Sequence, residues 1–461
     1  MSDLKYIESI YRLYPELVRL LGLCVLNFSN YLNEIIKNTE KSIESIGNAF
    51  GDLGSLLRLE FGMGDSHNGG KSVVMMTFES NKVVYKPRNM QLEKAYCELL
   101  SWLNAQDISD FYHLKAFKVL CGANSGYMEY IENAPCDDEE DVHRFYRRIG
   151  QLLCVLYTLR GCDFHYENLI AQKDHPILID LETILGNSLF EWDNAKSPVE
   201  QVRAFINESV LKTALLPSKI INRKNKKFID IGGVSFSESQ EFPFSSSVIE
   251  NIDGEQVKVI NRFTKASSSN NNPILQGKTI SASNYISEIK HGFSIMYTWI
   301  KDNKENYINT TAKIFGKCSY RTILKSTNFY FQLLKTSYHP DLLQSSIDRF
   351  IFLHRVGIPT DSIDTVQAQV GAEEIKQLYN GDIPYFTALP GKNSICVPQR
   401  KKSIKYYTYS ANDSIKRCVS ALSNLDLSYQ SFLIEASFNL QYEEIFESML
   451  SKLNKQEGIA I

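Results

Sequence analysis

The fold expected of this chain is decided by residues 160–183, RGCDFHYENLIAQKDHPILIDLET. The first part of the stretch places three polar side chains within six residues: Asp163, His165 and Asn168. The second part is an apolar run, typical of a buried strand, that ends at Asp180 and Glu182. In a phosphotransferase, a loop supplies one carboxylate that orients a hydroxyl and an amide that holds a metal ion, and a following strand brings a second carboxylate to that metal. Asp163, Asn168 and Asp180 fit these three positions.

The segment before this stretch decides between two interpretations of it. Asp and Asn are common in turns, so a D-x-H-x-x-N match taken alone indicates a solvated loop more often than a site. Helical spacing of apolar residues predicts a buried helix that leads into the loop, through Phe145, Ile149, Leu152, Leu156 and Leu159. A helix, an acidic loop, an apolar strand and an acidic strand end then follow in the order of a kinase C-lobe.

Length and composition restrict the class of protein. A chain of 461 residues exceeds one typical hydrophobic core and predicts two lobes or domains. The formal net charge of -3 gives no electrostatic basis for bulk nucleic-acid binding. Nine scattered cysteines without a C-x-x-C pair favour reduced, buried thiols over a zinc site or a disulfide framework. The N-terminus lacks a signal-peptide pattern and no stretch reaches transmembrane length, so we expect a cytoplasmic protein that does not bind a membrane.

The first segment, residues 1–61, is expected to be helical. Apolar residues recur at helical spacing from Tyr6 to about Glu60. We interpret Pro15 as a helix start and Gly22 as a helix break. The pattern assigns no chemistry here, and packing against the next lobe and docking of a partner both stay open.

Residues 62–131 have the pattern of a nucleotide-binding lobe. β-branched and aromatic residues predict two strands joined by a turn, with further strands near the end of the segment. Glycines ahead of the strands would let backbone N–H groups approach phosphates, although their spacing is not that of a P-loop. Lys86 ends the second strand, where kinases place the lysine that binds the α- and β-phosphates, and Glu93 or Glu98 of the following helix would be its partner. A solvated strand-end lysine is the alternative.

A candidate hinge at residues 127–130 leads into the third segment, residues 132–280. That segment contains the acidic loop and then a loosely patterned stretch, as expected for activation and substrate loops. The stretch includes the polar tract SSSNNNP at 267–273 and the basic run RKNKK at 223–227. A basic run is more often a solvated face than a contact with an acidic partner.

Residues 281–461 return to helical periodicity, and one helix is predicted over residues 318–343. Within it, Arg321 and Thr327 are six residues apart, which is about 600° around a helix. Their side chains can therefore line one site only if the segment between them bends or unwinds. Outside a site, an Arg and a Thr on a helix are ordinary.

Seven motifs of the chain carry a family resemblance: GDSHNGGKSVVMMTF, VVYKPRN, DFHYENLIA, HPILIDLET, YRTILKSTNFY, SYHPDLL and GDIPYF. In their order and approximate spacing they resemble the dehydratase domain of class II lanthipeptide synthetases, from about residue 10 onward. The resemblance implies an α+β, two-lobed, lipid-kinase-like fold with additional helical segments. It implies an enzyme that uses ATP and magnesium (Mg2+) to phosphorylate Ser and Thr of a ribosomal precursor peptide and then eliminates phosphate, leaving dehydroalanine or dehydrobutyrine.

The resemblance also implies roles for individual residues. Asp163 would act on the substrate hydroxyl with His165 beside it, and the metal would be held by Asn168 and Asp180, with Glu182 near it. The remaining catalytic candidates are Asp65, His67, Arg321 and Thr327, of which the last two would serve elimination. The candidates for nucleotide binding are Lys86, Ser66, Gly70, Met128 and Glu129.

The chain departs from the family pattern in three respects. Synthetases of this class carry a zinc-dependent cyclase after the dehydratase, whereas no cyclase-like Cys/His motif is found here, so we expect ring closure to need a separate cyclase or not to occur. Part of the usual N-terminal extension is also lacking. Lys71 and Lys325 stand where the family often has arginine, which keeps the charge and loses the bidentate geometry.

Two alternatives to a dehydratase stay open. In a peptide kinase that stops at phosphorylation, Arg321 and Thr327 would be dispensable. A pseudoenzyme that only binds a leader peptide would not need the intact Lys86, Asp163 and Asp180.

Overall fold

The computed structural model describes residues 4–187, 197–222, 228–235, 240–251, 257–265, 270–357, 365–397 and 402–439. The basic run at 223–227 and the first three residues of the polar tract at 267–273 lie outside these ranges. The chain divides into two compact units whose segments alternate along the sequence. Unit 1 contains Met1–Glu98, Phe117–Tyr130 and Ile314–Ser410, and unit 2 contains Leu99–Ala116, Ile131–Lys313 and Ala411–Ile461. The assignment of a lipid-kinase-like fold, with its four successive segments, stays a prediction.

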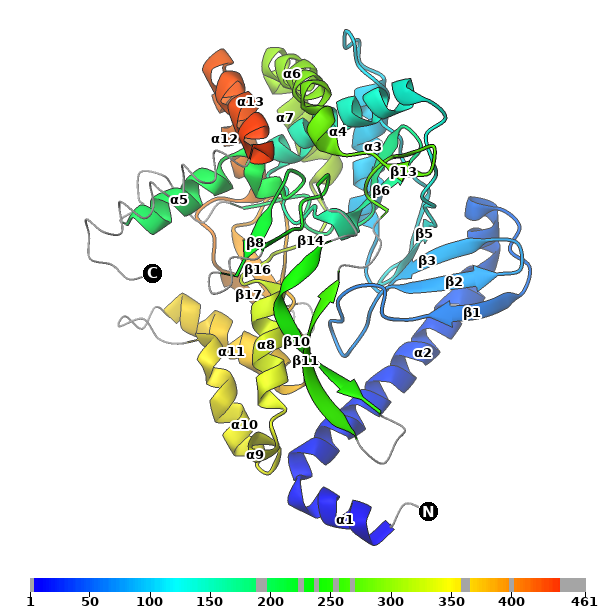
Figure 1. Cartoon of the computed structure of the whole chain (residues 1–461), viewed down its shortest axis with the longest axis vertical. Coiled ribbons are helices and arrows are strands. Elements are labelled where there is room, and N and C mark those ends of the chain that lie inside the picture. Colours follow the sequence, from blue (N-terminus) through cyan, green and yellow to red (C-terminus); the bar gives the residue numbers. More distant parts are fainter. Residues whose placement is uncertain are drawn as a thin grey trace. The chain divides into compact units, whose positions relative to one another are not determined.

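Unit 1 contains an antiparallel sheet of five strands in the order β1-β2-β3-β5-β4 (Figure 1). The strands are β1 (Leu56–Glu60), β2 (Val74–Phe78), β3 (Lys82–Lys86), β4 (Val119–Cys121) and β5 (Gly126–Glu129). β2 and β3 form the hairpin that the β-branched residues predicted, with Val74 opposite Tyr85. The further strands expected near the end of residues 62–131 are confirmed as β4 and β5. Helix α3 (Gln91–Asn104) follows β3, as expected.

Two helices precede this sheet, α1 (Leu4–Leu13) and α2 (Pro15–Phe50). Pro15 is the first residue of α2, which confirms it as a helix start. Gly22 lies within α2, so the predicted helix break is wrong. The expectation of helix up to about residue 60 is also wrong, because α2 ends at Phe50 and β1 follows. Gly51 and Gly54 end the helical stretch with positive φ, a conformation that glycine adopts readily.

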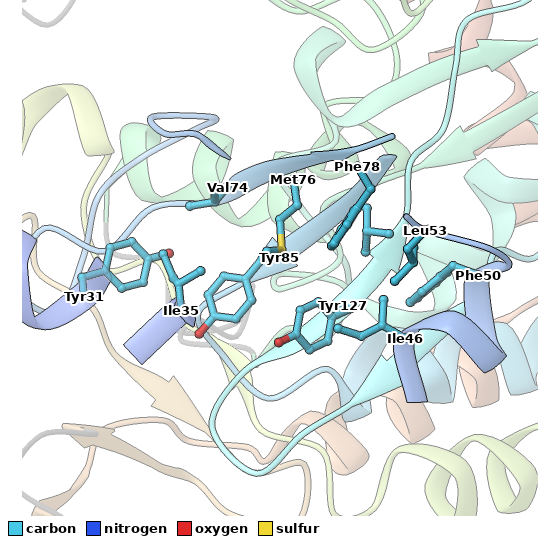
Figure 2. Close-up of a cluster of buried hydrophobic side chains, with 11 residues drawn as sticks. Tyr31, Ile35, Ile46, Phe50, Leu53, Val74, Met76, Phe78, Tyr85 and Tyr127 are labelled. Carbon is cyan, nitrogen blue, oxygen red and sulfur yellow. The ribbon is translucent and has the colours of Figure 1, made fainter. Parts of the chain in front are cut away.

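The sheet and α2 bury one common core, drawn in Figure 2. The burial of β2 alternates along the strand, as a sheet with one covered face requires. The core is formed by Tyr31, Ile35, Ile46 and Phe50 of α2 together with Leu53, Val74, Met76, Phe78, Val83, Tyr85 and Tyr127. The strand that ends at Lys86 is therefore anchored on its buried side by large side chains.

A buried ion pair joins the start of α2 to α10 (Ser346–Leu353) within unit 1. Arg349 Nη1 lies 3.1 Å from Glu16 Oε1, and both side chains are fully buried. The guanidinium also donates to the carbonyls of Tyr379 (2.7 Å) and Leu378 (3.1 Å). Glu16 thus supplies the counter-charge of an arginine that water does not reach.

Glu16→Ala is expected to lower the free energy of unfolding by about 3–5 kcal/mol, because it leaves the buried Arg349 charge unpaired. The matched control is Glu8→Ala, which removes an exposed ion pair with Arg12 and should change stability by less than about 0.5 kcal/mol. Urea denaturation of both variants measures the difference. Equal midpoints for the two variants would contradict this assignment.

The second part of unit 1 combines helices with a four-stranded sheet in the order β14-β15-β16-β17. Its elements are β14 (Tyr320–Arg321), α8 (Thr327–Ser337), α9 (Pro340–Leu343), α10, α11 (Thr365–Tyr379), β15 (Thr387–Ala388), β16 (Ser394–Val397) and β17 (Lys402–Lys405). The single helix predicted over residues 318–343 is therefore wrong: its start is a strand, and the rest is divided into α8 and α9. Arg321 lies on β14, where it pairs with Thr387, and Thr327 is the first residue of α8. The segment between them leaves helical geometry, which is the condition for both to line one site.

Unit 2 is built around α4 (Glu139–Leu159), the buried helix predicted ahead of the acidic loop. α4 packs side by side with α6 (Ile286–Asp302) (Figure 1). The two helices approach closely at two glycines: a Cβ on Gly150 would lie 2.0 Å from the Ile289 carbonyl oxygen, and one on Gly292 would lie 1.9 Å from that of Arg147. Any larger residue at either position would push the helices apart.

The other elements of unit 2 are shorter or flank this pair. They are β6 (Leu169–Gln172), β7 (His175–Leu178), α5 (Pro198–Asn207), β8 (Lys219–Ile221), β9 (Phe228–Asp230), β10 (Glu241–Glu250), β11 (Lys258–Lys265), β12 (Ile274–Leu275), β13 (Lys278–Thr279), α7 (Lys304–Phe315), α12 (Ala411–Ala421) and α13 (Asn424–Phe438). In the part of the chain that the structure describes, no helix has the length and apolar character needed to cross a membrane.

Candidate functional site

The acidic loop begins where α4 ends. Arg160 caps the helix in the left-handed conformation (φ 65°), and Asp163 adopts the same conformation (φ 69°). Among residues with a Cβ, Asp and Asn tolerate this region best. Two hydrogen bonds fix the base of the loop: Thr183 Oγ1 donates to the Cys162 carbonyl (2.6 Å), and the Cys162 amide donates to the Thr183 carbonyl (3.2 Å). The two ends of residues 160–183 are thereby tied together.

Asn168 is held at the centre of the loop. Its side-chain Nδ2 donates to the Asp163 carbonyl (2.8 Å) and lies 3.4 Å from His165 Nε2. Because the amide nitrogen is used inside the loop, the amide presents its oxygen as the atom able to face a cation. Asn168 lies in the short 3-10 helix Tyr166–Asn168. His165 caps the N-terminus of this helix, and its Nδ1 accepts the Glu167 amide (3.3 Å).

The β6–β7 hairpin brings the second acidic cluster to the first. Leu169 lies opposite Leu178, and the Ile179 amide donates to the Asn168 carbonyl (3.1 Å). Asp180 therefore follows directly on a residue that is bonded to Asn168. This register supports the expectation that Asp163, Asn168 and Asp180 lie together. The order of the residues in the sequence does not specify the register.

The side chains of this loop are partly exposed, as groups that meet a substrate must be. The Asp163 carboxylate lies 3.9 Å from His165 Nε2, and Asp180 Oδ1 accepts the Glu182 amide (3.4 Å). No cluster of three or more His, Cys, Asp and Glu side chains suited to a metal occurs among the described residues. A carboxylate and an amide oxygen nevertheless fit Mg2+, which takes few protein ligands and completes its shell with water and phosphate oxygens.

Lys86 lies at the end of β3 and is 5% exposed. Its Nζ is 3.7 Å from Glu93 Oε1 on α3, so the pairing expected with Glu93 is present. Arg88 also donates to Glu93, through Nη1 at 3.0 Å. One buried carboxylate therefore holds two cations at the end of this strand, and the role of Arg88 was not predicted.

The residues expected at the hinge lie on β5. Met128 is buried and pairs with Val84, while Glu129 Oε2 accepts the Lys118 amide (2.9 Å). The segment of unit 1 that contains them, Phe117–Tyr130, ends here, and Ile131 belongs to unit 2.

The glycine-bearing loop is closed by a pair of hydrogen bonds between His67 and Lys71, each 2.9 Å long. Gly69 and Gly70 have φ of 86° and 75°, which suits glycine alone. Their amides donate to the two carboxylate oxygens of Asp382, at 2.8 and 3.0 Å. Ser66 and Asp65, ahead of this turn, are exposed. The amides expected to approach phosphates thus hold an internal carboxylate in this structure.

Arg321 and His67 both lie against one aromatic ring, that of Tyr385. The Arg321 guanidinium carbon lies 5.5 Å from the centre of the Tyr385 ring, and the His67 ring lies 5.1 Å from the same ring. His67 Nδ1 is also 3.0 Å from the Ile383 carbonyl. Since a carbonyl oxygen only accepts, Nδ1 carries the proton in that contact. GDIPYF, which contains Asp382 and Tyr385, was a motif of the sequence to which no chemistry was assigned.

The two lysines that stand where the family often has arginine are each engaged by a glutamate. Lys71 Nζ lies 2.5 Å from Glu34, and Lys325 Nζ lies 2.6 Å from both oxygens of the buried Glu374. An ammonium can replace a guanidinium in such contacts, because a point charge next to a carboxylate needs no planar fork.

The candidates thus form one set in each unit. Unit 2 holds the acidic loop, with Asp163, His165, Asn168, Asp180 and Glu182. Unit 1 holds the remaining candidates: Asp65, Ser66, His67, Gly70, Lys86, Met128, Glu129, Arg321 and Thr327.

Comparison with known proteins gives two matches. A family model described as "Domain of unknown function (DUF4135)" matches residues 14–389, a range that includes every candidate of both sets. The "Lacticin 481/lactococcin biosynthesis protein LcnDR2" of Lactococcus lactis subsp. lactis is 26% identical over 353 residues. The alignment covers 72% of this chain and 36% of that protein, so the chain spans little more than a third of the length of this curated relative.

Proposed function

The chain belongs to the family described as a domain of unknown function (DUF4135), and from this membership we propose that it modifies a ribosomal precursor peptide in lanthipeptide biosynthesis. The similarity to a protein named for lacticin 481 biosynthesis supports this role. We propose further that the modification is dehydration: ATP-dependent phosphorylation of Ser and Thr, followed by elimination of phosphate.

The observation that carries the phosphorylation step is the register of the acidic loop. The Asn168 side chain donates to the Asp163 carbonyl, and the amide of Ile179, the residue before Asp180, donates to the Asn168 carbonyl. In this proposal Asp163 orients and deprotonates the substrate hydroxyl, with His165 beside it. Asn168 and Asp180 would hold Mg2+, which neutralises charge on the phosphates when bound, and Glu182 would lie near them.

The nucleotide would be bound by residues of unit 1. Lys86, fixed by Glu93 at a strand end, would neutralise phosphate charge, as the corresponding lysine does in kinases. Ser66 and Gly70 of the glycine-bearing loop and Met128 and Glu129 of β5 are the further proposed contacts.

Elimination needs groups that a plain kinase does not. Hydroxide is too poor a leaving group at neutral pH, so phosphorylation first converts the side-chain hydroxyl into a phosphate ester, from which phosphate can leave. A base then removes the Cα proton while cations and donors stabilise the departing phosphate. Arg321 has the planar fork that suits a phosphate, and Thr327 lies at the start of α8, where helix amides favour anions. His67 and Asp65 would act with them.

Lys86→Met is expected to reduce the stabilisation of the protein by Mg-ATP and to lower ATP turnover by about 10²-fold, because a preorganised charge on the phosphates is lost. A ligand that binds only the folded state raises the melting temperature, so a thermal-shift titration measures binding and a coupled ATPase assay measures turnover. Peptide affinity should not change.

The matched control for this variant is Lys82→Met, which removes an exposed lysine from the same strand. It should retain both the thermal shift and the turnover. If Lys86→Met lost peptide affinity and kept ATP turnover, the lysine would belong to the peptide-binding surface. If the wild-type protein showed no shift with Mg-ATP, the pseudoenzyme alternative would be favoured.

A further inference from the structure

The loop Gly381–Tyr385 of unit 1, part of the motif GDIPYF, makes contacts that the proposed mechanism does not use. Asp382 is 8% exposed and accepts one amide on each carboxylate oxygen, from Gly69 and Gly70. Two N–H groups that point at one carboxylate fix the direction of both peptide planes. Asp382 therefore determines the conformation of the turn that follows His67.

The contact of Asp382 with the two amides has a desolvation cost, because it buries a carboxylate. Burial raises the pKa of the Asp382 carboxyl above its ordinary value, although the Gly69 and Gly70 amides and nearby His67 act in the opposite direction. An apolar side chain or a glycine would avoid the desolvation. Because burial disfavours the charged form of Asp382, we attribute its presence to the geometry that it imposes on the turn and not to a contribution to stability.

The same loop fixes the ring of His67. The Ile383 carbonyl accepts from Nδ1 at 3.0 Å, which fixes the orientation of the ring. The Tyr385 ring contacts both the His67 imidazole and the Arg321 guanidinium. A guanidinium over an aromatic face is held in orientation as well as in place. The Tyr385 ring therefore positions two side chains, His67 and Arg321, that are distant in the sequence.

We propose that Asp382 and Tyr385 are positioning residues for the elimination of phosphate, Asp382 by holding the turn that follows His67 and Tyr385 by contacting both His67 and Arg321. The inference rests on the proposed function and adds two residues to it. Tyr385 is assigned no part in phosphate transfer, so its loss should slow elimination and spare phosphorylation. Loss of Asp382 also releases the amide of Gly70, a proposed nucleotide contact, so the role of Asp382 is measured on the turn itself.

The role of Tyr385 is tested by the ratio of phosphorylated to dehydrated peptide, measured by mass spectrometry during a reaction with Mg-ATP. Tyr385→Leu should slow elimination by roughly 10–100-fold, since small displacements of catalytic groups have effects of this size. Phosphorylation should stay within about twofold of the wild-type rate. Tyr385→Phe keeps the ring and should behave as wild type.

The matched control is Tyr379→Leu, which removes another half-buried tyrosine that lies under an arginine, here Arg19 at 4.0 Å. It should not change the product ratio. Equal slowing of both steps in Tyr385→Leu, or a Tyr385→Phe variant as slow as Tyr385→Leu, would overturn the role assigned to the ring.

The role of Asp382 is tested without reference to activity, by hydrogen exchange of the Gly69 and Gly70 amides. Asp382→Ala should increase their exchange rates by about 10-fold or more, because each amide loses its acceptor. Unchanged rates would show that Asp382 does not hold the turn. If the wild-type protein gave neither phosphorylated nor dehydrated peptide, the proposed function would fail and the role in elimination with it. The exchange rates would still show whether Asp382 holds the turn.

Discussion

Asp180→Asn is expected to reduce peptide phosphorylation by about 10²–10³-fold, the size of effect that follows when one preorganised electrostatic contact to a reacting group is lost. The substitution keeps the shape of the side chain and removes one negative charge from the proposed metal ligands. The amide that Asp180 accepts comes from Glu182, and an Asn oxygen can accept it equally well, so the fold of the loop should survive. Phosphate transfer to a precursor peptide, followed with labelled ATP, measures the effect.

The control for this variant lies in the same loop. Glu167→Gln removes an exposed carboxylate, to which no role is assigned, from the short helix that contains Asn168. It should retain turnover within about twofold, because a solvated charge has weak interactions with its neighbours. A turnover rate in Asp180→Asn equal to that of the wild-type protein would contradict the assignment of Asp180 to the metal.

Arg321→Ala is expected to leave phosphorylated peptide as the accumulating product. Its loss should slow elimination by about 10²–10³-fold, because the departing phosphate loses a bidentate donor, whereas phosphorylation should continue. Arg321→Lys should be intermediate, since a lysine keeps the charge and loses the planar fork. Mass spectrometry of the peptide over time separates the two steps.

Complete dehydration by Arg321→Ala would show that this arginine has a structural role. The strand contact of residue 321 with Thr387 uses backbone atoms, so the alanine variant should keep the pairing of β14 and β15. A loss of both steps with a normal melting temperature would also count against a specific role in elimination.

The acidic loop could be anticipated from the sequence because its determinants are local. A helix with buried spacing, a turn rich in Asp and Asn, and a short apolar strand each follow from neighbours in the chain. The hairpin of β2 and β3 and the position of Lys86 at its end were predicted for the same reason. The contact between Lys86 and Glu93 also joins residues close in sequence.

The errors and omissions arise where distant segments decide the structure. Arg321 lies in a stretch with helical periodicity, yet it forms a strand because Thr387 supplies a partner more than sixty residues later. Gly22 does not break α2, since one glycine costs a helix only about 1 kcal/mol and the rest of a long helix can compensate. The contacts of Asp382 and Tyr385 with the glycine-bearing loop could not be read from spacing at all.

We propose that this chain both phosphorylates a precursor peptide and eliminates the phosphate. The most direct test is the mass of a precursor peptide with a Ser/Thr-rich core after incubation with the protein and Mg-ATP. We expect a loss of about 18 Da per modified residue, the net result of phosphate transfer and elimination. A stable gain of about 80 Da per residue would contradict it and identify a peptide kinase that does not eliminate.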